Sequence, residues 1–405
     1  MLRKSHSKAG FIKNMFFSAS SIALSIGFMQ FVLLPLVSRT MDDEAYGFML
    51  TLVAIVDVFA VTFGGTLCSI RLIKKEKYES ISGDFSVLSL VYSALGCIIV
   101  IVVCYIFGEK SLLGLALIGV YAFLLFYHSY GSVYFRLKKV FKLELLSAVL
   151  MVIGFLLGFV VLKATGVWQF IYIIGYAFAV VYSCGLYGKI LKEPFVKTAY
   201  FRETAKDSVQ LNLSSFLIVL VTYADKLILF KLMGGAIGAV YNAAAIVGKC
   251  VALITNPING LLLSYLSNNK TQTKRYLNYG WVLAVMVAVT AYFLFLFISR
   301  PMLNILYPQY CDRAMAIIPY TLGAAMINAI YAMINPFILK ALSPRIQIIM
   351  NSTSLVVYVV SAYLLYKMWG LIGFCLSLML AGIIKLCFLL FCTVRINVST
   401  GGDLG

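Results

Sequence analysis

The chain has 405 residues and a formal charge of +18. It is 62% hydrophobic and only 12% charged, with a mean hydropathy of +0.98. Globular soluble domains carry roughly 25% charged residues, so this composition excludes an ordinary soluble enzyme. Only helices and closed barrels satisfy their backbone hydrogen bonds in lipid, and apolar runs this long and continuous form helices. The sequence therefore predicts an all-α polytopic membrane protein.

Twelve apolar stretches follow one another along the chain, and each can form a spanning helix of about 20 residues. The first is too long for the apolar core of a signal peptide and no small-residue cleavage site follows it, so we expect a retained helix. Proline removes a backbone donor and clashes with the preceding turn. We therefore expect the eighth span to bend at Pro257 and the tenth at Pro319 and Pro336. The predicted spans are 14–36, 47–70, 86–107, 112–134, 143–162, 168–188, 209–231, 236–266, 276–298, 314–338, 346–366 and 371–393.

The loops between these spans alternate between basic and nearly neutral. Most of the 33 lysines and arginines lie in the N-terminal tail and in every second loop after it. The positive-inside rule then puts both termini in the cytoplasm. In a soluble protein such a basic balance would suggest nucleic acid. Here the charges are explained as topology determinants beside anionic headgroups, and we expect no nucleic-acid partner.

The spans divide into two predicted lobes of six helices each, residues 1–188 and 209–405. The hydrophilic segment 189–208 between them mixes basic and aromatic residues. It is either a short amphipathic helix along the cytoplasmic surface or a plain solvated linker. In the first lobe, Gly154 and Gly158 permit close helix packing.

The two lobes show a weak internal similarity. One constant shift along the chain superposes Arg39 on Lys231 and Asp57 on Lys249, so that in both places a basic residue ends one span and a charge lies within the next. Two repeats in the same orientation would place a substrate site between them.

Four segments, in order along the chain, resemble O-antigen (Wzx-type) polysaccharide flippases. In the first, Pro35, then Arg39, then Tyr46-Gly47 match the end of the first span and the start of the second. The other three segments are Asp225-Lys226 with Gly238 and Tyr241, Pro301–Tyr310 with Ala314, and Trp369–Gly373. One segment departs from the family pattern: at Leu232–Ala236 a Leu-Gly turn with an acidic residue is expected.

The resemblance covers nearly the whole chain and implies the fold of the multidrug/oligosaccharidyl-lipid/polysaccharide (MOP) transporters, two six-helix lobes around a central cavity. It implies a flippase that moves an undecaprenyl-pyrophosphate-linked oligosaccharide from the cytoplasmic to the periplasmic leaflet of a bacterial inner membrane by alternating access. The implied partners are that lipid-linked oligosaccharide, membrane lipids and other polysaccharide-assembly proteins. Enzyme activity and cofactors are not expected.

Charged side chains inside the predicted spans are the candidate functional residues. A charge at mid-bilayer costs about 2.5–3.5 kcal/mol even on lenient scales, so each such residue faces a partner or a watery cavity. Arg39 and Lys231 lie near the ends of their spans. The deep charges are Asp57, Asp225, Lys226, Lys249 and Lys385.

Three of the basic residues are candidates for binding the substrate. Arg39, Lys226 and Lys249 belong to spans 1, 7 and 8, which line the cavity in the family that the chain resembles, and lysine and arginine suit a pyrophosphate. Two alternatives are open. Asp57 and Lys249 could neutralise each other, and Arg39 could be an interfacial anchor.

The remaining candidates have weaker support. Asp57 or Asp225 could bind a coupling proton or cation, and Lys231 could add to the basic set. Lys385 could equally be structural and snorkel towards the surface. Aromatic rings stack on sugars, although most tyrosines in such a protein lie at the interface or face lipid. The tyrosines selected on this basis are Tyr223, Tyr241 and Tyr331.

Other chemistry finds little support in the sequence. The segment Ala243–Cys250 only approximates a phosphate-binding loop and lies within an apolar span. Of the two histidines, His128 is interpreted as a packing or interfacial residue, and the cysteines show neither disulfide nor metal-ligand spacing. Two rival functions stay open. A drug or cation antiporter of the same fold would need an acidic cavity, and a membrane-embedded polysaccharide enzyme would need a large loop or a catalytic cluster.

Overall fold

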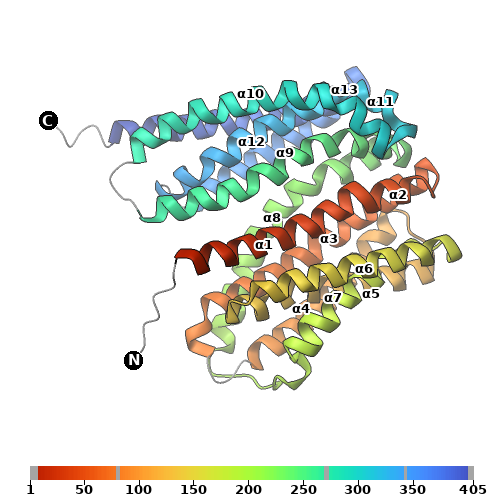
Figure 1. Ribbon diagram of the computed structural model, residues 1–405, viewed down its shortest axis with the longest axis vertical. Coiled ribbons are helices and arrows are strands. Elements are labelled where there is room, and N and C mark those ends of the chain that lie inside the picture. The colour runs from red at the N-terminus through yellow and green to blue at the C-terminus, as the bar shows by residue number, and fades with distance from the viewer. Residues whose placement is uncertain (1–7, 79–82, 269–272, 342–343, 400–405) are drawn as a thin grey trace. The chain divides into compact units, whose positions relative to one another are not determined.

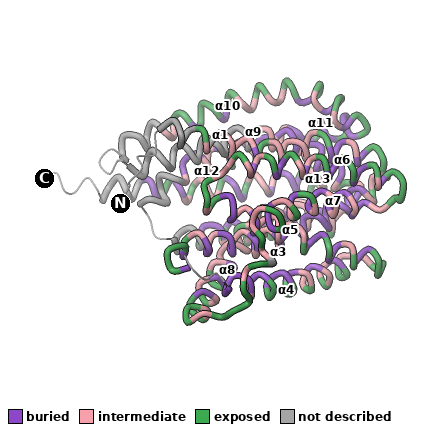
Figure 2. The backbone as a smooth tube through the Cα atoms, turned by 60° about the horizontal axis from the view of Figure 1, so that its bottom comes forward, coloured by how far each residue is buried: buried purple, intermediate pink, exposed green. Residues whose placement is uncertain are grey.

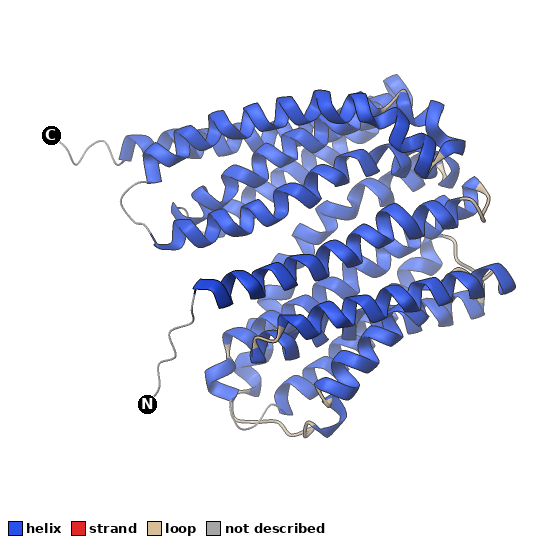
Figure 3. Cartoon of the chain, viewed as in Figure 1, coloured by secondary structure: helices blue, strands red, loops and turns tan. Residues whose placement is uncertain are grey.

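The computed structural model describes residues 8–78, 83–268, 273–341 and 344–399, and within these ranges the regular structure is helical with no strand (Figure 3). Nine of the described helices are long and apolar enough to cross a membrane, or ten when a bent pair counts as one span. Each of the twelve predicted spans falls on helix. The prediction of an all-α polytopic membrane protein is confirmed.

The chain divides into two compact units, Met1–Phe230 and Lys231–Gly405. The boundary lies at the end of the seventh predicted span and not in the predicted linker 189–208. The division into two lobes of six helices therefore stays a prediction, and the two units are described one at a time.

The first unit contains the α-helices α1 to α8, which Figure 1 labels, and only the last three residues of α8 belong to the second unit. Short π and 3-10 segments lie between some of these helices. In this unit α3 packs against α4 and α5, while α6 packs against α1 and α7. In chain order the elements are α1 (Lys8–Phe28), η1 (Met29–Leu33), α2 (Leu34–Ser38), α3 (Asp43–Ile73), η2 (Lys75–Tyr78), α4 (Gly83–Phe107), α5 (Leu112–Lys138), α6 (Phe141–Thr165), α7 (Gln169–Val180), η3 (Val181–Tyr187), η4 (Ile190–Lys192) and α8 (Phe201–Met233).

Helix α3 is the most buried span of this unit, with 72% of its apolar window inside the protein. It begins where Asp42 accepts a hydrogen bond from the backbone N–H of Ala45, at 3.1 Å. Asp43 and Glu44 lie in its first turn, where negative charge favours the helix dipole. Asp42, Asp43 and Glu44 therefore form the start of α3.

Close packing of α6 on α7 depends on two glycines. A Cβ on Gly154 would lie 2.8 Å from Cα of Gly175, and one on Gly158 would lie 2.5 Å from Cα of Ile171. Any side chain at these positions would separate the helices. The predicted role of the two glycines is confirmed.

Helix α8 runs antiparallel to α3 and contacts it through side chains. The rings of Phe59 and Phe216 are 5.4 Å apart, and so are those of Phe48 and Phe230. Because the earlier residue of α3 pairs with the later residue of α8, the two helices run in opposite directions. The contacts explain why α8 belongs to the first compact unit.

The second unit is built around α12, which packs against α9, α10 and α13. Many residues of α10 are exposed (Figure 2), and only 17% of its apolar window is buried, as expected for a helix that faces lipid. The elements are α9 (Gly235–Asn268), α10 (Thr273–Leu306), η5 (Pro308–Tyr310), α11 (Cys311–Met315), α12 (Ile318–Ala341) and α13 (Pro344–Ser399).

The tenth predicted span is broken. Its two parts, Pro308–Met315 and Ile318–Asn335, meet at an angle of 80°. Pro319 is the second residue of α12, a position at which the backbone N–H has no helical partner, so proline is tolerated there. The break thus lies just before Pro319 and not at it. Pro301 lies within α10, which continues beyond the predicted end of the ninth span. Pro257 and Pro336 lie outside the residues whose side chains are described.

The last two predicted spans form α13, which is interrupted at Trp369 and Gly370. Gly370 has φ of +56° and ψ of −134°, a conformation open to glycine. A Cβ on Gly373 would lie 2.0 Å from the carbonyl oxygen of Leu365. The Gly-x-x-Gly segment is therefore the turn between the two predicted spans.

Candidate functional site

In the first unit, the deep acid Asp57 lies among tyrosines from three other helices. Tyr223 on α8 forms a side-chain hydrogen bond with Asp57 on α3. Tyr121 on α5 and Tyr176 on α7 lie within electrostatic range of the same carboxylate. We call Asp57, Tyr121, Tyr176 and Tyr223 the Asp57 cluster. The cluster places an ionisable carboxylate near three phenols inside the spans, and the phenol of Tyr223 is hydrogen-bonded to it.

The tyrosines of this cluster are held by ring stacking. The ring of Tyr121 is 5.8 Å from that of Tyr176 and 4.8 Å from that of Tyr172, and Tyr121 is fully buried. His128 lies 5.2 Å from Tyr176, which agrees with a packing role. Of these residues, sequence reasoning selected Asp57 and Tyr223. It missed Tyr121 and Tyr176, because nothing in the sequence distinguishes them among 26 tyrosines.

Lys226 lies about one helical turn after Tyr223 on α8 and contacts its ring. The Lys226 ammonium lies 5.7 Å from the Tyr223 ring, within cation–π range. The neighbouring Asp225 accepts a hydrogen bond from the backbone N–H of Lys226, at 2.8 Å. Both side chains are half-buried. Two candidates of opposite charge thus occupy adjacent positions near the Asp57 cluster.

The two candidates at span ends are exposed. Arg39 is the C-cap of α2, and Lys231 lies in the last turn of α8. Basic residues at helix C-termini interact favourably with the helix dipole. The two interpretations of Arg39, cavity residue and interfacial anchor, both place it at such an exposed end.

In the second unit, Lys249 lies half-buried on α9. Its ammonium donates a hydrogen bond to the side-chain oxygen of Asn242, at 3.3 Å. Tyr241, next to this asparagine, is buried with its ring 5.8 Å from that of Phe374. The Asn242 amide and the Lys249 ammonium, two turns apart on α9, therefore lie side by side.

Lys385 on α13 lies over the ring of Tyr331 on α12, with the ammonium 5.6 Å from the ring centroid. The contact joins two predicted candidates and agrees with the structural interpretation of Lys385. Nearby, Met333 and Leu389 belong to the buried core of this unit.

Helix boundaries support the internal similarity found in the sequence. Asp57 and Lys249 stand the same number of residues after Asp43 and Gly235, the first residues of α3 and α9. The charges thus occupy equivalent positions in two long helices, one in each unit. That Arg39, Lys226 and Lys249 face one cavity stays a prediction.

A second cluster, which sequence reasoning missed, ties segment 189–208 to the ends of α3 and α4. The guanidinium of Arg71 donates to both carboxylate oxygens of Glu193, at 2.5 and 3.1 Å. Their side chains are only 9% and 14% exposed. The guanidinium also lies 5.1 Å from the ring of Tyr134 and 5.5 Å from that of Phe85. Such a bidentate pair fixes both position and orientation.

Asp84, fully buried in the first turn of α4, is the second anchor for this segment. Its carboxylate accepts hydrogen bonds from the backbone N–H and the hydroxyl of Thr198, both at 2.6 Å, and from the hydroxyl of Tyr78 at 2.7 Å. Donors at a helix N-terminus make a buried carboxylate tolerable. Burial raises the pKa of the Tyr78 phenol, so this hydroxyl stays a donor.

Lys74, just after α3, is the third anchor. Its ammonium contacts Asp207 at 2.7 Å and Glu203 at 3.1 Å, both in the first turns of α8. Burial would lower the pKa of Lys74, but these two hydrogen-bonded carboxylates outweigh it and raise the pKa above 10.5. The contacts at Arg71, Lys74 and Asp84 are here called the linker clasp. The segment 189–208 is therefore held to the ends of α3 and α4 by side-chain contacts, and its last residues form the first turns of α8. That it lies along the cytoplasmic surface stays a prediction.

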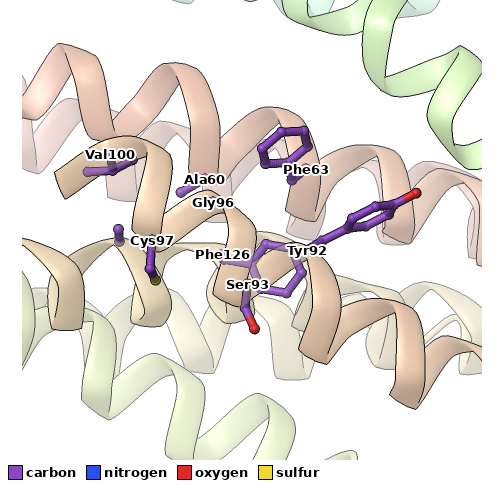
Figure 4. Close-up of a pocket in the computed structure, with 9 residues that line it drawn as sticks. Ala60, Phe63, Tyr92, Ser93, Gly96, Cys97, Val100 and Phe126 are labelled. Atoms are coloured by element: carbon purple, nitrogen blue, oxygen red, sulfur yellow. The ribbon is translucent and has the colours of Figure 1, made fainter. Parts of the chain in front are cut away.

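A small pocket between α3, α4 and α5 is apolar and contains none of the predicted site residues (Figure 4). Phe63, Tyr92 and Phe126 line it, together with small residues such as Gly96. It offers nothing to a pyrophosphate. Among the residues that the structure describes, no group of three histidines, cysteines or acids could hold a metal ion.

Solved structures with a similar fold are membrane transporters. The lipid II flippase MurJ in an inward closed conformation aligns with a TM-score of 0.73 and 16% identity, covering 94% of this chain and 86% of that one. An inward-facing multidrug resistance MATE family transporter of the MOP superfamily aligns with a TM-score of 0.61 and 16% identity, covering 95% and 94%. An outward-facing MATE transporter gives 0.61, also at 16% identity, with 97% and 96% covered. The fold is therefore that of the MOP superfamily.

Comparison at the level of sequence gives the family. No curated protein matches the chain in sequence. The profile of the polysaccharide biosynthesis proteins matches residues 11–270, which is more than half of the chain. The chain belongs to the polysaccharide biosynthesis protein family.

Proposed function

We propose that this protein is a flippase for a lipid-linked saccharide. The substrate would be an undecaprenyl-pyrophosphate-linked repeat unit of an O-antigen or similar polysaccharide, moved from the cytoplasmic to the periplasmic leaflet by alternating access. Family membership is the observation that carries the proposal. The MOP fold, which a lipid II flippase also has, supports it.

The basic residues inside the spans give this proposal its chemistry. Lys226 and Lys249 are half-buried, and the ammonium of each lies beside a group that can orient it, a tyrosine ring and an amide oxygen respectively. In this proposal these two lysines and Arg39 bind the pyrophosphate and Tyr331 contacts the glycan, whereas the buried Tyr241 packs against Phe374. Such sites use charge-assisted hydrogen bonds, which are stronger than neutral ones.

A second candidate function is a drug or cation antiporter, which the fold shared with MATE transporters and the Asp57 cluster favour. An antiporter would bind cations at acids such as Asp57 and Asp225. The flippase hypothesis gives the same acids a different role, coupling or charge pairing. The two functions therefore differ in whether the lysines or the acids contact the substrate.

The experiment is complementation of a bacterial strain that lacks its polysaccharide flippase, with analysis of the surface glycan. We expect the wild-type chain to restore polysaccharide, and Lys249→Ala to abolish it at unchanged protein level. Lys367→Ala, a basic residue near the turn of α13, is the matched control and should complement normally. Full complementation by Lys249→Ala and Arg39→Ala would contradict the charged site, while drug resistance without any polysaccharide would favour the antiporter.

A further inference from the structure

Between two anchors of the linker clasp, four residues of the linker form an exposed tip. Glu193 is held by Arg71 and Thr198 by Asp84, which leaves Pro194–Lys197 between them. Phe195 is 60% exposed and Val196 56% exposed. These two adjacent apolar side chains lie outside the membrane-spanning helices, in a largely polar segment.

The backbone of the tip cannot turn these side chains inward, because it lies directly against the first residue of α4. A Cβ on Gly83 would lie 2.3 Å from the carbonyl oxygen of Val196 and 2.9 Å from that of Pro194. Only glycine permits this approach. The backbone of the tip is therefore held against α4, and it keeps Phe195 and Val196 exposed.

The position of the tip along α4 places it at the membrane surface. Leu90, Leu95 and Ile98 on α4 are all at least half exposed, as expected for a face in contact with lipid. Leu90 lies roughly 10 Å along the helix axis from Gly83 at 1.5 Å per residue. That is the depth over which interfacial segments cross from headgroups to acyl chains. Phe195 and Val196 thus lie at the end of a lipid-facing helix.

The charges around the tip are basic. Lys189, Lys192 and Lys197 are exposed, while Glu193, the acid among them, is engaged by Arg71. Apolar residues flanked by lysines are the pattern of segments that lie in the interface of anionic membranes. A bilayer supplies both the apolar boundary and the negative charge.

We propose that the tip Pro194–Lys197, with Lys189 and Lys192, is a binding surface for anionic lipid headgroups, into which Phe195 and Val196 insert. The lysines contact phosphate groups and the two apolar side chains enter the acyl boundary. Because the clasp fixes the tip to α3 and α4, this contact ties the segment before α8 to the membrane surface. The inference holds for any transported substrate.

The test places a reporter at the tip of the full chain in lipid nanodiscs. Phe195→Trp is reconstituted in phosphatidylcholine alone and in a mixture with phosphatidylglycerol, with brominated chains as quenchers, and the signal of the three native tryptophans is subtracted using the wild-type protein. We expect bromolipid to quench the new tryptophan, more strongly with phosphatidylglycerol, and water-soluble acrylamide to quench it weakly.

Variants that remove lysine charges test whether the tip binds anionic headgroups rather than another partner. In the Phe195→Trp background, Lys192→Gln with Lys197→Gln should reduce quenching in phosphatidylglycerol to the level in phosphatidylcholine. The matched control, Lys110→Gln with Lys163→Gln, removes the same charge from the connection between α4 and α5 and from the end of α6, away from the tip, and should leave the quenching unchanged. Equal quenching in both lipids would overturn the anionic preference. Quenching by acrylamide alone would overturn the proposal and leave the tip to a soluble protein partner.

Discussion

Arg71 and Glu193 form a nearly buried, bidentate ion pair across 122 residues of sequence. The guanidinium also donates to the hydroxyl of Tyr130 at 2.5 Å. The ion pair thus joins the last turn of α3 to Glu193, the residue directly before the tip. Removal of one partner would leave an uncompensated charge in a site with little water.

The ion pair therefore predicts an asymmetric mutational response. Glu193→Ala should destabilise the first unit by about 3–5 kcal/mol, because the Arg71 charge stays buried without its carboxylate. Replacement of both residues by methionine should cost much less, since a buried pair and an apolar pair of similar volume are often near equal. Thermal unfolding in nanodiscs measures both, and Glu76→Ala, an exposed acid in η2, is the control. A double variant as unstable as the single one would contradict this account.

Lys74 gives the linker clasp a defined pH dependence. Its pKa in the folded protein lies above the ordinary 10.5, because Asp207 and Glu203 favour the ammonium more than burial disfavours it. A raised pKa contributes stability below the unfolded value, and this contribution is lost as the pH rises through the folded value. Amide exchange at the start of α8 should thus be protected equally from pH 7 to 9, after correction for its intrinsic rate, and lose protection only above about pH 10.5. Lys74→Met should show no such alkaline loss, and a loss below pH 9 would contradict the assignment.

Gly83 predicts a specific effect on the tip. Gly83→Ala should displace the linker, because its Cβ would meet the backbone of Val196 and Pro194, which cannot rotate away. We expect a loss of about 1–3 kcal/mol and faster trypsin cleavage after Lys192 and Lys197. Gly65→Ala is the control, since a Cβ there meets nothing within 4 Å and alanine favours a helix. Equal cleavage in both variants would show that the tip is not held by this contact.

The spans could be predicted from the sequence because each depends on local composition. An apolar run of sufficient length must form a helix in lipid, and the break within α13 was predicted as the gap between the spans 346–366 and 371–393. The linker clasp could not be predicted, because Arg71 and Lys74 fit the positive-inside pattern equally well as solvated loop charges. Their partners lie more than a hundred residues away, and one sequence carries no record of such pairing.

The candidate site was predictable only in part. A charge inside a span is conspicuous, which is why Asp57, Lys226, Lys249 and Lys385 could be selected. The tyrosines that surround Asp57 are not conspicuous, since an aromatic residue within a span is ordinary. Which of the selected charges share one site depends on how the helices are arranged, and composition carries no such information.

The Asp57 cluster predicts graded effects on transport. Asp57→Asn should abolish transport if the carboxylate carries a coupling proton, whereas Tyr223→Phe should reduce it about tenfold, because it removes one hydrogen bond worth about 1–1.5 kcal/mol. Complementation titrated by expression level measures both variants. Tyr363→Phe, an exposed tyrosine of α13, is the control. Full activity of Asp57→Asn would exclude a coupling role for this residue.

Gly370 predicts that the turn within α13 is needed to form the last two spans. Gly370→Ala forces a side chain into φ of +56° with ψ of −134°, which costs about 1–3 kcal/mol. Gly373→Ala should be worse, because its Cβ would lie 2.0 Å from the backbone oxygen of Leu365 and the turn would have to open. Gly238→Ala in α9 meets nothing within 4 Å and is the matched control. Thermal unfolding should rank the three variants in that order of damage, Gly373 above Gly370 above Gly238. A neutral Gly373→Ala would mean that the two spans are not held together by this close approach, and that the resemblance at Trp369–Gly373 has no structural basis.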